Sequence, residues 1–185
     1  MLALAERAAA TGLPARYVRG NAEDLPFRDG WFDAGRAERV FQYVARPDRA
    51  IAEIARVIRP GGRILINDPD HESLVIDHPA PDLWRRVKAF RTDVTRPNGR
   101  GAHQLRRLFK EAGLADITVD VRTLQVSSLA EAFDCQTWGR RAVSYGAISE
   151  SECAIWESGL AEMDAGGNFT YAMNYYSVAG TKAAA

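Results

Sequence analysis

The residues best suited to chemistry lie together in the run Asp68-Pro69-Asp70-His71-Glu72. They follow the β-branched segment Arg63 to Asn67, which predicts a short strand. Carboxylates and an imidazole at the end of a strand suit general acid–base chemistry, so His71 or Asp70 is a candidate general base acting on a substrate hydroxyl or acidic carbon. A solvated acidic loop that caps the following helix explains the same residues equally well. No converging ligand set supports a metal, and we predict none.

The segments around this run predict a parallel sheet. Ala15 to Arg19 and Asp33 to Arg36 are further strand candidates, and an apolar stripe from Ile51 to Ile58 predicts a helix between the second and third strands. Pro47 suits the start of that helix, and Pro60-Gly61-Gly62 ends it and turns the chain. Alternating strands and helices imply βαβ units, whose ligands bind beyond the carboxyl ends of the strands.

The remainder of the chain predicts further helices and two long strands. The expected helices cover Met1 to Ala10, Asp82 to Val94, Leu105 to Gly113, Ser128 to Tyr145 and Ser149 to Met163, the last opening with a capping box; the expected strands are Asp116 to Val126 and Phe169 to Thr181. We expect these two strands to form an antiparallel hairpin at the sheet edge. The aromatic residues near the end of the chain, Trp138 and Tyr175 among them, either line a pocket for a flat substrate or pack in the core.

Composition narrows the class of protein. A chain of 185 residues with 46% hydrophobic residues fits one globular domain spanning 1–185. Its 24 basic and 24 acidic residues balance, which gives no case for nucleic acid or an anionic membrane as a partner. No apolar run reaches the length of a membrane span or resembles a signal peptide. Two cysteines provide no disulfide framework, so we expect a reducing cytoplasm.

Four short motifs carry a resemblance to a known family. GNAEDLPF, DGWFDA, ERVFQYV and ARVIRPGGRILINDPD occur in this order between residues 20 and 70. In that order and at those spacings they resemble the second half of a class I S-adenosylmethionine-dependent methyltransferase, closest to the ubiquinone and menaquinone C-methylases. The family's glycine-rich GxGxG loop and the acidic residue that ends its second strand do not occur in the sequence.

The resemblance implies a function. We expect an N-terminally truncated Rossmann-like α/β methyltransferase sheet that transfers a methyl group from S-adenosylmethionine to a small molecule, with weak or no activity by itself. A cofactor-free partner subunit or ligand-binding module of the same fold is the alternative.

The resemblance also implies site residues. Asn21 and Ala22, with the neighbouring Glu23, would hold the adenine of the cofactor, and Arg36 and Glu38 would lie beside its methionine part. For a hydroxylated or quinone-like acceptor, the substrate-binding candidates are Asp68, Trp138 and Tyr175.

The family's strand order, 3-2-1-4-5-7-6, sets an expectation for the sheet. With strands 1 and 2 absent, strand 4 would expose unpaired backbone groups. We therefore predict that strand 3 (Ala15 to Arg19) closes up beside Asp33 to Arg36, giving the order 3-4-5-7-6. The alternative is a homodimer in which a second copy covers this edge.

Overall fold

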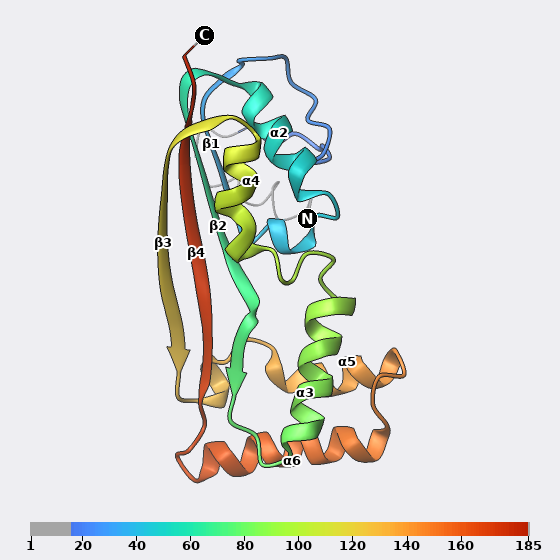
Figure 1. The fold of residues 1–185 in the computed structure, drawn as a ribbon. Helices are drawn as coiled ribbons and strands as arrows, with labels where there is room; N and C mark the ends of the chain where they lie inside the picture. Colours follow the sequence, from blue (N-terminus) through green and yellow to red (C-terminus); the bar gives the residue numbers. More distant parts are fainter. Residues whose placement is uncertain (1–15, 185) are drawn as a thin grey trace.

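A four-stranded mixed sheet forms the centre of the computed structural model, which describes residues 16–184 (Figure 1). Its order is β1-β2-β4-β3, with β1 parallel to β2 and with β4 antiparallel to both β2 and β3. The strands are β1 (Phe32–Glu38), β2 (Ile58–Ile76), β3 (Leu114–Val126) and β4 (Tyr171–Lys182). The α-helices are α2 (Pro47–Val57), α3 (Pro81–Ala89), α4 (Leu105–Glu111), α5 (Trp138–Ser144) and α6 (Glu150–Ala165).

The helices pack in two groups against opposite halves of the long strands. Near β1, α2 and α4 bury Ile51 and Phe109 against Ile64 and Ile66 of β2. At the other end α3, α5 and α6 enclose a second core that includes Trp156, and Figure 1 shows the two groups one above the other. β2 and β4 run through both halves, so they tie the two cores together.

Short irregular helices connect these elements. They are the 3₁₀ turns η1 (Phe41–Tyr43), η3 (Ala102–Gln104), η4 (Leu129–Glu131) and η5 (Cys135–Thr137), and the π-type turn η2 (Phe90–Val94). Two of them, η1 and η2, contribute to the site described below.

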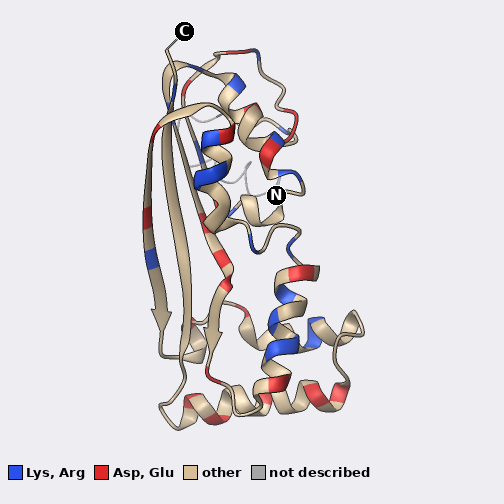
Figure 2. Ribbon diagram, in the orientation of Figure 1, with Lys and Arg blue, Asp and Glu red and all other residues tan. Residues whose placement is uncertain are grey.

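Several predicted features are confirmed. The strand order 4-5-7-6 and the antiparallel edge hairpin correspond to β1-β2-β4-β3. Pro47 opens α2, and Ser149 and Glu152 form the capping box of α6. Figure 2 shows β4 almost free of charged residues, with Lys182 at its end as the exception.

The predicted strand at Ala15 to Arg19 is wrong. Ala15 lies outside the described residues, residues 16–20 form no strand, and within 16–184 β1 pairs only with β2. The following loop is instead attached to α2, because Arg56 donates to the backbone oxygens of Leu25 and Phe27 at 3.0 and 2.8 Å. The expected helix over Met1 to Ala10 also lies outside the described residues.

Two further boundaries differ from prediction. The run from Asp68 to Glu72 is part of β2 rather than a loop, since β4 pairs with β2 from Arg63 to Asp70 and again at Val75 and Ile76. The helix expected over Ser128 to Tyr145 is split into η4, η5 and α5. Phe133 interrupts it with a φ of 51°, a left-handed conformation that no α-helix contains. Across residues 16–184, every helix is too short or too polar to cross a lipid bilayer.

Candidate functional site

A cavity lies where the chain leaves β1 and where β2 passes between the two cores. Its volume is about 320 Å³, and we call it the arginine cavity. Its walls come from the segment after β1, from β2 and β4, from η2 and from the break before η5. The lining residues are Arg39, Gln42, Tyr43, Pro69, His71, Arg91, Arg96, Phe133, Asp134, Tyr171, Met173 and Tyr175.

Gln42 joins two of the polar groups in this cavity. Its Oε1 accepts from Arg96 Nε at 2.8 Å and lies 2.7 Å from His71 Nε2. Because a guanidinium only donates, this atom of Gln42 must be the oxygen, and His71 must therefore carry its hydrogen on Nε2. That assignment leaves His71 Nδ1 as an acceptor, and this buried atom has no hydrogen-bond partner within residues 16–184.

The electrostatic environment keeps His71 neutral. Its side chain is 1% exposed. Burial, followed by the positive charges of Arg96, Arg91 and Arg39, lowers the pKa of His71 to about 2. At ordinary pH the imidazole is therefore a hydrogen-bonding group and a weak base.

Asp68 positions η1 from beneath the site. Its carboxylate accepts from the backbone N–H groups of Val40, Phe41 and Gln42, each at 2.9 Å. Burial raises the pKa of Asp68 to about 6, against the opposing effect of these three donors and of Arg39. Its carboxylate is thus used to hold the turn that carries Gln42, and a direct substrate contact by Asp68 remains a prediction.

Arg91 is held in the cavity wall by an aromatic ring. It is 7% exposed, its guanidinium lies 3.5 Å from the centre of the Trp138 ring, and its NH1 is 3.9 Å from Asp134 Oδ1. The same carboxylate oxygen accepts from Trp138 Nε1 at 3.0 Å. Burial, followed by the neighbouring charge of Arg96, lowers the pKa of Arg91 to about 10. Trp138 therefore supports the site through Arg91, and it does not line the cavity.

Arg39 and Phe133 form the mouth of the cavity. The Arg39 guanidinium stacks 5.1 Å from the centre of the Phe133 ring. Both residues have left-handed backbones, with φ of 55° and 51°, which is uncommon for bulky side chains. Such conformations concentrate at functional sites, where the surrounding structure enforces them.

The other predicted residues are placed as follows. Tyr175 lines the arginine cavity. Asp70 does not line it, because its Oδ2 lies 3.0 Å from His103 Nδ1 and its Oδ1 accepts from the Glu72 N–H at 3.1 Å. The structure therefore brings His71 and Tyr175 together and turns Asp70 away from them. The roles predicted for all three stay predictions.

The predicted cofactor residues gather at the exposed side of β1. A cavity of about 400 Å³ there, which we call the edge cavity, is lined by Ala22, Arg36 and Glu38 together with apolar side chains such as Phe32 and Ile54. Arg36 and Glu38 form an ion pair at its rim. Asn21 and Glu23 belong to the adjoining turn, in which the Asn21 side chain accepts from the Glu23 N–H at 3.0 Å.

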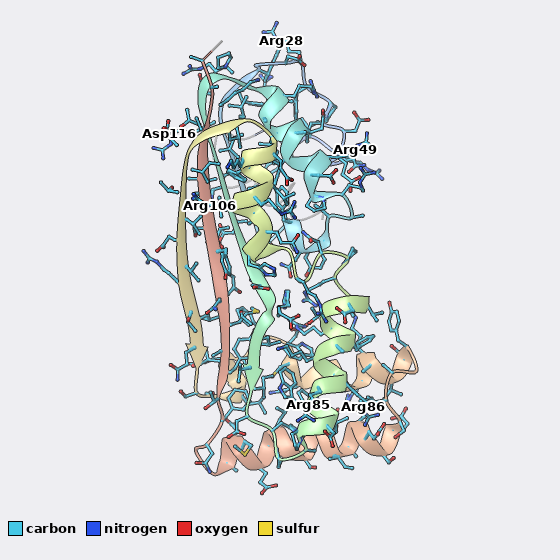
Figure 3. The ribbon with its side chains drawn as sticks, viewed as in Figure 1. Arg28, Arg49, Arg85, Arg86, Arg106 and Asp116 are labelled. Carbon is cyan, nitrogen blue, oxygen red and sulfur yellow. The ribbon has the colours of Figure 1, made fainter. Side chains whose placement is uncertain are left out.

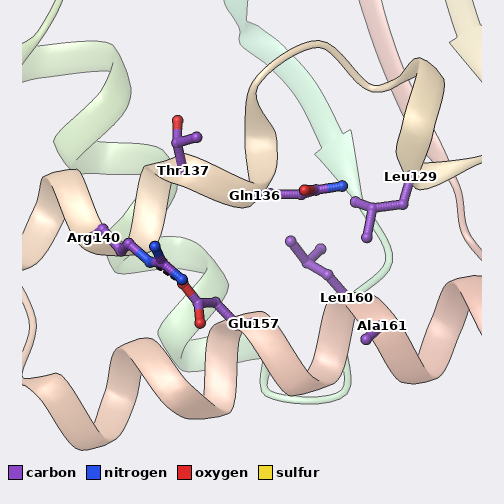
Figure 4. Close-up of a pocket in the computed structure, with 7 residues that line it drawn as sticks. All are labelled: Leu129, Gln136, Thr137, Arg140, Glu157, Leu160 and Ala161. Carbon is purple, nitrogen blue, oxygen red and sulfur yellow. Dashed lines mark hydrogen bonds and ion pairs between the residues drawn. The ribbon is translucent and has the colours of Figure 1, made fainter.

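A cavity of about 370 Å³ between α5 and α6 offers less chemistry (Figure 4). Its two charged residues, Arg140 and Glu157, pair with each other at 2.7 Å, and Leu129, Leu160 and Ala161 complete the apolar part of its wall. Within residues 16–184 no group of three or more His, Cys, Asp or Glu side chains is arranged to hold a metal.

Sequence reasoning missed Gln42, Arg91 and Arg96. In the helix predicted from Asp82 to Val94, charged residues such as Arg85 and Arg91 are expected on the outer face, but the structure buries Arg91. The spacing of Leu83, Val87 and Arg91, four residues apart, was the available signal, since residues at this spacing share one face and the first two are buried. By contrast Arg85 and Arg86 lie on the outside of α3, as Figure 3 shows.

The sheet order is the one expected for the methyltransferase fold. The chain is similar in fold to the YcgJ protein from Bacillus subtilis over 98% of this chain and 77% of that protein, with a TM-score of 0.62 and 18% identity. It is also similar in fold to a putative methyltransferase from Bacillus halodurans over 92% of this chain and 79% of that protein, with a TM-score of 0.55 and 16% identity. A family model described as a methyltransferase domain matches residues 1–66.

Curated relatives extend the match. A 37.1 kDa uncharacterized protein of transposon Tn4556 from Streptomyces fradiae is 39% identical over 171 residues, which cover 90% of this chain and 48% of that protein. The ubiquinone/menaquinone biosynthesis C-methyltransferase UbiE of Methylobacterium nodulans is 41% identical over 75 residues, or 40% of this chain and 28% of the enzyme. This chain thus spans less than half the length of either relative. The family model confirms, over residues 1–66, the resemblance to S-adenosylmethionine-dependent methyltransferases that the motifs predicted.

Proposed function

We propose that the protein transfers a methyl group from S-adenosylmethionine to a small molecule bound in the arginine cavity. One observation carries this proposal: the segment from Glu38 to Tyr43 forms a wall of both cavities. Glu38, Val40 and Phe41 line the edge cavity, whereas Arg39, Gln42 and Tyr43 line the arginine cavity. For transfer, the methyl group and its acceptor must come into contact beside this segment. A cavity of about 420 Å³ there shares Glu38 with the edge cavity, and it shares Arg39, Phe133 and Tyr175 with the arginine cavity.

The edge cavity fits part of the cofactor. Its apolar walls suit a flat ring, and the Glu38 carboxylate at the end of β1 can accept from hydroxyl or ammonium groups. Asn21, Ala22 and Glu23 would hold the adenine, while Arg36 and Glu38 would contact the remainder. When bound, S-adenosylmethionine supplies an electrophilic methyl group on its sulfonium.

The contribution of the chain to methyl transfer is then positioning. Holding two reactants in line can supply about 7–11 kcal/mol of a barrier. His71 Nδ1 can accept a hydrogen bond from the acceptor and fix its orientation, while the aromatic walls, including Tyr175, exclude water. With a pKa of about 2 His71 is too weak a base to retain a proton, so orientation is the role that its surroundings favour.

Cofactor affinity tests the proposal. The 185 residues contain no GxGxG loop, and losing two or three hydrogen bonds at about 1–3 kcal/mol each would weaken a micromolar site to millimolar. We expect calorimetry to show millimolar S-adenosylmethionine binding by this chain and tighter binding by a longer chain that carries such a loop. Glu38→Gln should weaken binding further, and Glu162→Gln, at an exposed position on α6 in the other half of the molecule, is the control. Methyl transfer is measured on the longer chain with labelled cofactor. Micromolar binding by the 185 residues would contradict the expected weakness, and a longer chain that neither binds nor transfers would refute the function.

The free edge of β1 favours a second proposal, that another copy of the chain covers it. Within residues 16–184 this edge has no partner strand, and the adjoining cavity is apolar. We expect light scattering to detect a dimer that Ala34→Lys, a charge on the exposed strand, dissociates, while Val119→Lys on β3 leaves it intact. A monomer at high concentration excludes the dimer. If the dimer forms and the longer chain transfers no methyl group, the cofactor-free partner subunit becomes the better interpretation.

A cytoplasmic location of the protein stays a prediction.

A further inference from the structure

The arginine cavity carries an excess of positive charge. Arg39, Arg91 and Arg96 line it, and Asp134 is the one carboxylate among its lining residues, which leaves a formal charge of +2 (three minus one). Asp134 is not a close partner for any of the three. Its Oδ1 lies 3.9 Å from Arg91, and its shorter hydrogen bond goes to Trp138.

This arrangement differs from that of the arginines on the surface. Arg85, Arg86 and Arg107 are exposed, and each pairs directly with a carboxylate, namely Asp82, Glu152 and Glu111 (Figure 3 labels the first two arginines). Arg91 and Arg96 are only 7% and 8% exposed and have no carboxylate within 3.5 Å among the described residues. Burying a guanidinium is costly unless it is paired, so two buried ones beside a cavity indicate that an anion completes the site.

Polar and aromatic groups define the shape of that anion. Arg91 Nε is buried and has no hydrogen-bond partner within residues 16–184, so the guanidinium retains donor capacity. Planar guanidinium groups bind carboxylate and phosphate oxygens in pairs. Tyr43, Phe133, Tyr171 and Tyr175 provide flat aromatic surfaces around the same space.

We infer that the methyl acceptor carries an oxyanion, a carboxylate or a phosphate, on a flat unsaturated skeleton, with Arg39, Arg91 and Arg96 as its binding residues. That the bound oxyanion belongs to a methyl acceptor rests on the proposed function, whereas the anion site itself can be measured separately. A volume of about 320 Å³ restricts the ligand to roughly the size of a one- or two-ring compound.

Binding of matched probes tests the inference without cofactor. The 185-residue chain is titrated by ligand-observed NMR with 4-hydroxybenzoate, with its neutral methyl ester and with phenyl phosphate. Charge-assisted hydrogen bonds predict that an oxyanion probe binds roughly 10- to 100-fold tighter than the ester. The stronger of the two anions identifies the oxyanion. Equal binding of ester and anions, or no binding of either anion, overturns the inference.

A variant pair locates the site. Arg39→Asn removes one guanidinium at an exposed position, and asparagine tolerates the left-handed backbone there. We expect it to weaken the oxyanion probes about tenfold and to leave the ester unchanged. Arg85→Asn on α3 is the control and should change neither. An unchanged anion affinity in Arg39→Asn overturns the assignment, even if Arg91 and Arg96 variants fail to fold.

The outcome separates this inference from the proposed function. If the protein methylates only neutral acceptors and binds neither anionic probe, the anion site is refuted and the proposed methyltransferase function stands. If it binds the anions tightly but the longer chain transfers no methyl group, the anion site stands and the proposed reaction is refuted.

Discussion

Two buried groups on β2, Asp68 and His71, predict an unusual dependence of stability on pH. Both side chains are 1% exposed. The pKa of Asp68 rises from its ordinary value of 3.8 to about 6, because burial penalises the carboxylate. The pKa of His71 falls from 6.5 to about 2, because burial and three arginines penalise the imidazolium. We expect their contributions to the free energy of unfolding to cancel between about pH 4 and 6.

The signs and magnitudes follow from proton linkage. In this range the folded state holds a proton on Asp68 that the unfolded state lacks, so the contribution of Asp68 falls as pH rises. The unfolded state holds a proton on His71 that the folded state lacks, so the contribution of His71 rises with pH. Each contribution changes by about 1.4 kcal/mol per pH unit, or about 3 kcal/mol over two units, in opposite directions.

Single variants separate the two contributions. Urea unfolding is measured at pH 4, 5 and 6 for the unaltered chain, Asp68→Asn and His71→Asn, with Asp24→Asn at an exposed position as control. From pH 4 to 6, Asp68→Asn should gain about 2–3 kcal/mol relative to the unaltered chain, and His71→Asn should lose a similar amount. Exposed carboxylates titrate alike in all four proteins and drop out of the comparison. If Asp68→Asn parallels the unaltered chain, Asp68 is ionised in the fold and the reasoning fails.

Two further predictions concern the same strand. Asp68→Ala leaves the N–H groups of Phe41 and Gln42 buried without an acceptor, so it should lower the free energy of unfolding in urea by about 3–5 kcal/mol and weaken binding of the oxyanion probes. The control Asp48→Ala on the surface should cost under about 0.5 kcal/mol, and a loss below about 1 kcal/mol in Asp68→Ala would contradict the role of Asp68. In the longer, active chain His71→Ala should reduce turnover about tenfold or more with cofactor affinity unchanged. Asp70→Asn should reduce turnover less, because the Asp70 carboxylate faces His103. If Asp70→Asn reduces turnover more than His71→Ala, Asp70 is the base.

Most of the fold could be predicted because its signals are local. Pro47 and the stripe through Ile51 define α2, and Ser149 defines the start of α6. Pairing between strands is not local. The extension of β2 through Asp68 depends on β4, more than a hundred residues later, and no pattern within Asp68 to Glu72 reveals it. The attachment of the loop near Leu25 to Arg56 is equally non-local, which is why the strand predicted before it was wrong.

Reasoning from strand ends identified only part of the site. It singled out His71, which lines the arginine cavity although β2 continues through it, and it assigned the acidic residues of the run to the chemistry. The structure shows that Asp68 and Asp70 are taken up by protein donors, and that the cavity is built from arginines on separate segments. Arg39, Arg91 and Arg96 share no motif, because they converge through the packing of η2 and the following loop against β2. The sequence as a whole has equal numbers of basic and acidic residues, whereas the residues that line the arginine cavity include three arginines and one carboxylate.

The surplus of positive charge also bears on the need for a base. A hydroxyl on an acceptor in this cavity would ionise more easily than in water, because its oxyanion would lie among three guanidinium groups. The arginine charges that add to burial in lowering the pKa of His71 would likewise lower the pKa of an acceptor hydroxyl. A neutral imidazole then needs only to accept the hydroxyl hydrogen bond at Nδ1 while the proton leaves to solvent, and a strong base beside the acceptor becomes unnecessary. On this argument the arginines supply both the recognition of the acceptor and its activation.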